Sequence, residues 1–179
     1  AKEAAEYLNR QIDGSSVSFG GSMTLAQMGL FDSLGAHNTI YSHWNVPDGM
    51  NAAEVLRNAS TCDNYLLSAN GLAETGEIIN IDGTGNRVSS SLYGHKKVWF
   101  VVGSNKLAPT YEEALWRARN ISAPKNAQRL GVKTPCAVNG ERCYDCKSPQ
   151  RICRGLVVMW EAIRSCETEV VLIDEPLGY

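Results

Sequence analysis

Short apolar runs alternate along this chain with stretches whose apolar residues recur at helical spacing. The run "KKVWFVVG" (96–103) is unbroken and ends at a glycine, which is typical of a buried strand. Leu25, Met28 and Leu34 instead recur near the period of a helix. Further strands are expected over 16–19, 37–42, 65–68, 76–82 and 169–173.

Two residue pairs predict where helices begin. Asn51 with Glu54, and Thr110 with Glu113, have the spacing of a capping box, in which each residue satisfies a backbone N–H near the other. The helix that starts after Thr110 is expected to break in two at Pro124, because proline cannot continue the hydrogen-bond ladder.

Strands that alternate with helices predict an α/β fold, with a mostly parallel sheet flanked by helices in one domain over residues 1–179. Apolar residues at 44% and charged residues at 20% are ordinary for a globular chain. The segment 134–154 departs from this pattern because it has few apolar residues and many turn formers. We expect it to project from the sheet as a small Cys-rich lobe.

Charge and hydropathy exclude several function classes. A net charge of −2 argues against a nucleic-acid binder and against a protein of membrane surfaces. No apolar run approaches the ~20 residues that a membrane span needs. The opening "AKEAAEYLNRQIDG" has the pattern of an amphipathic helix and not of a secretory signal, and clustered cysteines suit a reducing compartment, so we expect a cytoplasmic protein.

Four polar loops, "FGGSMT", "SANG", "DGTGNR" and "GSNK", each follow a predicted strand. If these strands share one sheet, the loops converge at one edge, where α/β proteins bind ligands. Arg87 offers a planar fork for an anion, unless it forms a buried ion pair, and the residues after Ser22 open a helix with free N–H groups. The candidate residues for binding a small anionic substrate are Gly20, Gly21, Ser22, Thr24, Asn70, Asp82, Gly85, Asn86, Arg87, Asn105 and Lys106.

An ordinary tight turn is the alternative for each of these loops, since glycine, asparagine and aspartate are common turn residues. His43 follows a predicted strand and could face the same crevice, although a surface or capping role is favoured.

Four of the six cysteines lie within the segment 134–154: Cys136, Cys143, Cys146 and Cys153. Only the central pair has the close spacing of a zinc site, whereas iron–sulfur clusters accept looser spacings. Eight Lys and Arg but only Glu141 and Asp145 lie between residues 119 and 154, which favours thiolates there. The pattern predicts a 4Fe–4S cluster, with zinc and a disulfide or dithiol switch as the alternatives.

Several stretches together resemble the LUD-domain, or lactate utilization, family. They are "FGGSMTLAQMGL", the block 68–107 from "SANGLAETGEIINIDG" to "FVVGSNKL", "RARNISAPKNAQRL" and "KTPCAVNGERCYDCKSPQRIC". The resemblance implies a fold related to ribose-phosphate isomerases and CoA-transferases. It also implies a role in bacterial lactate oxidation beside iron–sulfur subunits. Family members usually carry a helical segment before the "FGGSMT" strand, and residues 1–12 resemble its end, so an upstream segment is expected.

Three functions follow from these observations. The first is a redox component of small hydroxy- or oxo-acid metabolism, with a 4Fe–4S centre beside an anion-binding crevice and iron–sulfur subunits as partners. The second is a non-redox enzyme of isomerase or transferase type with a structural zinc site. The third is a non-catalytic subunit that docks an iron–sulfur partner. The resemblance carries no catalytic residue over to this chain, and neither Glu74 nor Glu77 matches the glutamate nucleophile of CoA-transferases.

Overall fold

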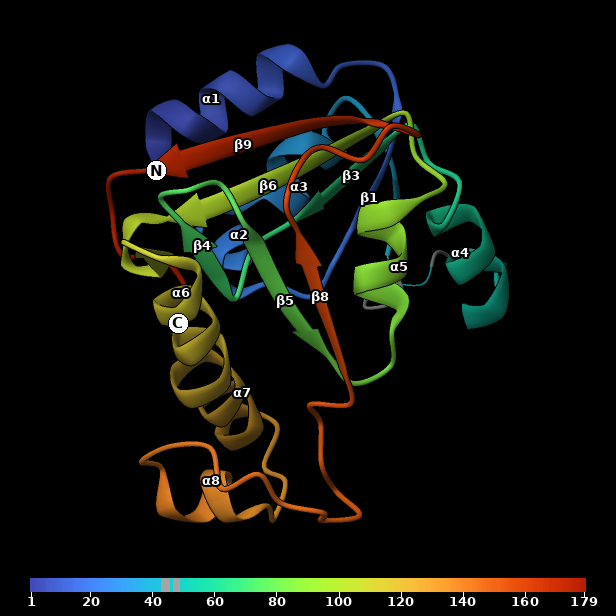
Figure 1. The fold of residues 1–179 in the computed structure, drawn as a ribbon. Helices are drawn as coiled ribbons and strands as arrows, with labels where there is room; N and C mark the ends of the chain where they lie inside the picture. Colours follow the sequence, from blue (N-terminus) through green and yellow to red (C-terminus); the bar gives the residue numbers. More distant parts are fainter. Residues whose placement is uncertain (43–45, 47–48) are drawn as a thin grey trace.

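A computed structural model describes residues 1–42, 46 and 49–179 of the chain. Two β-sheets lie against each other, and helices cover the remaining faces (Figure 1). His43, a possible crevice residue, lies outside the described residues. No helix in the described ranges combines the length and the apolar character that a membrane crossing needs.

The larger sheet has five strands that all pair in parallel, in the order β2-β1-β3-β6-β9. Its strands are β1 (Ser16–Phe19), β2 (Thr39–Tyr41), β3 (Asn64–Leu67), β6 (Lys97–Gly103) and β9 (Glu167–Ile173). β6 pairs residue for residue with β9. The mostly parallel sheet flanked by helices, predicted from the sequence, is confirmed.

A second, smaller sheet was not predicted. Its strands, in the order β7-β4-β5-β8, are β4 (Gly71–Ala73), β5 (Ile78–Asp82), β7 (Leu107–Ala108) and β8 (Gly155–Met159). The prediction that the loop "DGTGNR" follows a strand of the main sheet is wrong, because that loop follows β5. A tight turn joins β4 to β5, with Gly76 at φ 110°, and so short a connection allows only antiparallel pairing.

Eight α-helices lie in the described part of the chain. They are α1 (Lys2–Gln11), α2 (Met23–Gln27), α3 (Leu30–Gly35), α4 (Ala52–Ala59), α5 (Asn86–Leu92), α6 (Tyr111–Arg117), α7 (Ala123–Arg129) and α8 (Pro135–Asn139). Short stretches of other helix types are a 3₁₀ turn (Ser104–Lys106) after β6 and a π-helical turn (Ala118–Ser122) between α6 and α7.

The predicted helix starts are present. Asn51 and Glu54 form the full capping box, and Thr110 accepts a hydrogen bond from the Glu113 N–H. Two α-helices are present, as expected, and α7 begins beside Pro124. A π-helical turn joins them, so the chain stays helical between α6 and α7. Pro124 lies in the first turn of α7, a position where helices tolerate proline.

The strand β6 separates two apolar cores. Trp99 and Val101 face α1, α2 and α3, whereas Phe100 and Val102 face the second sheet. Alternate side chains of a strand point to opposite faces, so a strand buried on both faces must be apolar throughout. This is why the run 96–103 reads as unbroken.

We expect Phe100→Ala to lower the free energy of unfolding by about 3–5 kcal/mol, because it leaves a cavity at a fully buried position. Leu172→Ala on the neighbouring strand β9, where the side chain is 50% exposed, should change it by about 0.5 kcal/mol or less. Urea denaturation of both variants measures the difference, and equal losses would contradict the two-core arrangement.

Candidate functional site

A cavity of about 780 Å³ lies where the loops after β1, β3, β5 and β6 come together. This volume is within the range of small-molecule sites. Eight of the eleven predicted anion-binding residues line it: Gly20, Gly21, Ser22, Asn70, Asp82, Asn86, Arg87 and Lys106. The loops therefore converge, although they follow strands of two sheets and not of one.

The other three predicted residues do not line the cavity but form hydrogen bonds with residues near it. Thr24 Oγ1 accepts a hydrogen bond from Lys106, and Asn105 Oδ1 accepts one from the Leu177 N–H. Gly85, at φ 94°, precedes α5, and its N–H donates to Asp82 Oδ1. Glycine suits this position because a left-handed φ is strained for other residues.

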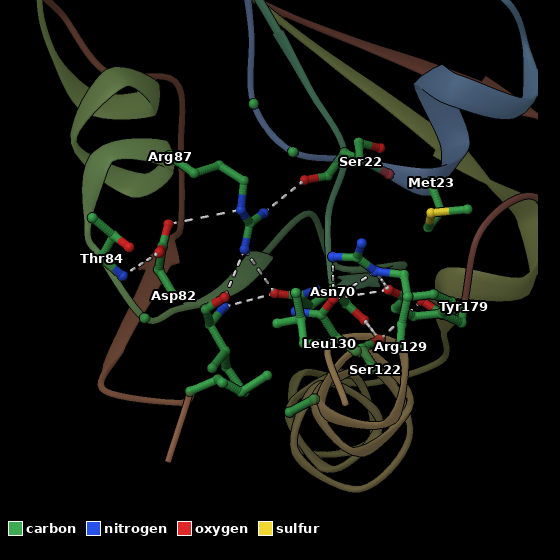
Figure 2. A pocket seen from close by; sticks show the side chains of 18 of the residues that line it. Ser22, Met23, Asn70, Asp82, Thr84, Arg87, Ser122, Arg129, Leu130 and Tyr179 are labelled. Carbon is green, nitrogen blue, oxygen red and sulfur yellow. Dashed lines mark hydrogen bonds and ion pairs between the residues drawn. The ribbon is translucent and has the colours of Figure 1, made fainter. Parts of the chain in front are cut away.

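Arg87 directs most of its donors at the protein itself (Figure 2). Nη1 donates to Asn80 Oδ1 at 2.6 Å, Nη2 donates to Ile81 O at 2.6 Å, and Nε lies 3.7 Å from Asp82 Oδ2. The two side chains of this ion pair are only 14% and 9% exposed. Burial lowers the pKa of Arg87, while the charge of Asp82 acts in the opposite direction. The structural alternative for Arg87, a buried ion pair, is therefore present.

Asp82 accepts hydrogen bonds from N–H groups at the start of α5 and in the turn before it, so part of this helix N-terminus is already bound by the protein. The carboxylate accepts hydrogen bonds from the N–H groups of Thr84, Gly85 and Val88. Gly20 lies close behind, where a Cβ would stand 2.7 Å from Tyr65 Oη and 2.9 Å from Arg87 Cγ. Glycine at position 20 thus makes room for the Arg87 side chain.

Lys106 is a second buried basic residue of this cavity. Its side chain is 4% exposed, and Nζ donates to Thr24 Oγ1 at 2.7 Å and to Ser68 Oγ at 2.8 Å. No carboxylate pairs with it among the described residues. Burial, together with the charges of Arg117 and Arg87, lowers the pKa of Lys106 to about 7. A large part of the Lys106 population is therefore a neutral amine at neutral pH.

A wall of the cavity that was not predicted from the sequence is formed by the segment 177–179, by α7 and by the π-helical turn before it. Ser122 Oγ lies 3.1 Å from Tyr179 O, and Arg129 Nε donates to Tyr179 Oη at 2.8 Å (Figure 2). Arg129, Arg151 and Arg154 also line the cavity. Their abundance around 119–154 was noted, but only as surroundings for the cysteines.

The four clustered cysteines line a second, small cavity, of about 10 Å³. Each is half-buried, and none of the six cysteines is in a disulfide. Several donors point at the sulfurs. Arg151 Nε is 3.2 Å from Cys153 Sγ, the Asp145 N–H is 3.3 Å from Cys143 Sγ, and Thr134 Oγ1 is 3.3 Å from Cys136 Sγ.

Two observations on these thiols point in different directions. They share one cavity, but in the part of the chain that the structure describes no three His, Cys, Asp or Glu side chains are arranged to hold one metal ion. The shared cavity brings together Cys136 and Cys153, which are 17 positions apart in the sequence. The segment 134–154, which includes α8, lies at one end of the molecule and leads into β8 (Figure 1).

The two cavities share a wall. Ala123, Arg151 and Ile152 line both of them. Arg151 also holds the cysteine segment together, because its guanidinium donates to the carbonyl oxygens of Cys146 and Cys153. The polar crevice and the thiols are therefore neighbours, separated by a single layer of side chains.

An α/β fold with a crevice at the strand ends is the class that the geometry defines. The model of the LUD domain matches residues 1–173, so the chain belongs to the LUD domain family, and this confirms the resemblance seen in the sequence. It is thus a protein related to lactate utilization. A comparison with curated proteins found no match.

Solved structures with some similarity include ribose 5-phosphate isomerase A from Neisseria gonorrhoeae, with 14% identity and a TM-score of 0.39 over 62% of this chain and 53% of that one. The eIF2B delta of Chaetomium thermophilum has 17% identity and a TM-score of 0.38 over 63% and 49%. A DUF162 family protein from Deinococcus radiodurans has 12% identity and a TM-score of 0.34 over 95% and 94%. The chain spans about half the length of the first two.

We expect Arg87→Met to lower the free energy of unfolding by about 3–5 kcal/mol, because it leaves Asp82 buried without its partner. Arg87→Lys should lower the free energy of unfolding by less, since lysine keeps the positive charge but lacks the planar guanidinium that donates several hydrogen bonds at once. Chemical denaturation checks this against Arg10→Met, an exposed position on α1. An unchanged stability of Arg87→Met would show that the guanidinium is not structural.

Lys106→Met should raise the free energy of unfolding, because it removes a charge that burial disfavours. The pKa is about 7 in the folded protein and 10.5 for an ordinary lysine, so between these values the unfolded state binds more protons. The stability of the native protein should therefore rise between about pH 7 and 10.5, on the order of a few kcal/mol, and the rise should vanish in the variant.

Urea denaturation at both ends of this pH window measures the effect. Lys2→Met, at a side chain that is 90% exposed, is the control and should keep the native pH dependence. A Lys106→Met variant that is less stable than the native protein would contradict the desolvation of this amine.

Proposed function

We propose that the protein is an iron–sulfur component of small hydroxy- or oxo-acid metabolism. In this proposal the crevice binds the acid, and Cys136, Cys143, Cys146 and Cys153 hold a 4Fe–4S cluster behind the shared wall. The observation that carries the proposal is this wall, formed by Ala123, Arg151 and Ile152, which places four thiols next to a polar cavity.

The charges of the crevice favour an anionic ligand. Among the described residues that line it, Arg87, Lys106, Arg129, Arg151 and Arg154 are basic and only Asp82 is acidic. Arg87 and Asp82 neutralise each other, and Lys106 is largely a neutral amine. The cationic excess therefore comes from Arg129, Arg151 and Arg154. Arginine forks are well matched to a carboxylate. The volume exceeds that of an acid of a few carbons, so water or a longer acid also fits.

The surroundings of the thiols suit a cluster that stays bound. N–H groups of Arg151 and Asp145 point at two of the sulfurs, and such hydrogen bonds stabilise thiolate ligands and tune their potential. A cluster with four cysteine ligands would supply electron transfer. Iron–sulfur subunits are then the natural partners, since electrons must reach or leave the cluster.

Structural zinc in a non-redox isomerase or transferase is the second candidate. The thiol-lined cavity, at about 10 Å³, is the size of one water molecule, so a single ion needs less movement of the thiols than four irons do. In the described structure no three of these side chains are set around one point. This applies to zinc and to a cluster alike, because each needs four ligands around one centre.

Purification without oxygen, followed by iron, sulfide and zinc assays, tests the proposal. We expect brown protein with iron and sulfide in equal amounts, and loss of most of both in each of the four Cys→Ser variants of the segment 134–154. Cys166→Ser, outside the segment, should keep its metal. Colourless protein with one zinc per chain would replace the cluster by the second candidate, and metal-free protein would reject both.

A further inference from the structure

We propose that Lys106 is a catalytic nucleophile that captures the carbonyl carbon of a small 2-oxo acid as a Schiff base. This inference rests on the proposed function in one respect, that the crevice receives an acid of this kind. It goes beyond that function because it assigns covalent chemistry to Lys106. From charge alone, this residue would only be expected to bind an anion.

The position of the amine is fixed on several sides. Lys106 ends the 3₁₀ turn that follows β6, the strand between β3 and β9 in the main sheet, and it lines the crevice. The hydroxyls of Thr24 and Ser68 hold Nζ from two directions. A group held in this way reacts with less loss of freedom than a mobile surface lysine does.

Space beside the amine is kept by a glycine. Gly178 has φ 67°, and a Cβ at this position would lie 3.0 Å from Lys106 Nζ and 2.8 Å from Thr24 Oγ1. Any larger residue would press on the nitrogen. The segment 177–179 thus passes close to the amine, and glycine at position 178 leaves the nitrogen in place at the wall of the crevice.

The electrostatics keep the nitrogen nucleophilic. The charged groups that influence it are Arg117 and Arg87, both cationic, and both disfavour a further positive charge. Lysine attacks a carbonyl only as the neutral amine, and desolvation beside another cation is a known way to obtain it. The two neighbouring hydroxyls accept its N–H groups but carry no charge of their own.

The remaining cations can receive the carboxylate of the acid. Arg129 and Arg154 line the same crevice, whereas Arg87 is committed to Asp82 and the backbone. The crevice therefore combines a neutral amine for the carbonyl with guanidinium groups for the carboxylate. A 2-oxo acid carries a carbonyl and a carboxylate on adjacent carbons, whereas a hydroxy acid has no such carbonyl.

The step balances without an oxidant or a reductant. The Nζ lone pair forms a C–N bond with the carbonyl carbon, and the C=O π bond opens to a carbinolamine. Both hydrogens of the amine then leave with the carbonyl oxygen as one water molecule, which gives the imine. Protonation of the imine withdraws electrons from the carbon, so the bound acid becomes a better electron acceptor than the free acid.

Reductive trapping tests the assignment. The purified protein is incubated with pyruvate and then with borohydride, which reduces an imine to a stable amine, and peptides are mapped by mass spectrometry. Because its lowered pKa raises the neutral fraction, Lys106 should carry at least about tenfold more adduct than any surface lysine. Lys106→Met should abolish this adduct, and Lys2→Met should leave it unchanged.

Calorimetric titration with lactate, which has no carbonyl, measures acid binding separately. Lactate binding without a Lys106 adduct would overturn the Schiff base and leave the proposed acid-binding crevice standing. An adduct on Lys106 without lactate binding would support the amine chemistry and count against a hydroxy acid as the ligand. Adducts spread evenly over surface lysines would overturn the inference whatever the affinity, because they would show no selective amine.

Discussion

The buried guanidinium of Arg87 joins the two sheets at the edge where the crevice forms. It extends from α5 and reaches the carbonyl of Ser68, after β3 of the main sheet, and Asn80 and Ile81 in β5 of the second sheet. A charge this deep is tolerated because Asp82 pairs with it and carbonyl oxygens accept its donors. The shape of the crevice thus depends on an interaction that no ligand needs to touch.

The crevice and the thiol-lined cavity lie next to each other, although their residues come from different parts of the chain. Arg151 connects them physically, since it lines both cavities and also contacts the sulfur of Cys153. A change of charge on one side of this layer is felt on the other, because Coulomb interactions weaken little across a few ångströms of protein.

The sequence predicted the parallel sheet because strands buried on both faces, such as β6, have a distinctive apolar pattern. It could not separate β5 into another sheet, since a strand has the same pattern in either sheet and only the short turn at Gly76 distinguishes them. Eight of the predicted site residues do line the crevice. Their loops come together at the ends of the strands even though the strands belong to two sheets. The contrasting roles of Arg87 and Lys106 depend on burial and on partners distant in sequence, which local pattern does not encode. Tyr179 reaches the crevice through contacts with Ser122 and Arg129, each at least 50 positions away.

The pairing of β6 with β9 has a consequence for the order in which the protein is made. β6 is complete about 60 residues before the first residue of β9 leaves the ribosome, and until then its outer edge has no partner. Synthesis of that length takes several seconds, and an unpaired apolar edge strand is a site for pairing with other chains. The nascent chain is therefore most prone to aggregate in this interval, and it is during this interval that a chaperone bound to residues 97–103 would be of greatest benefit.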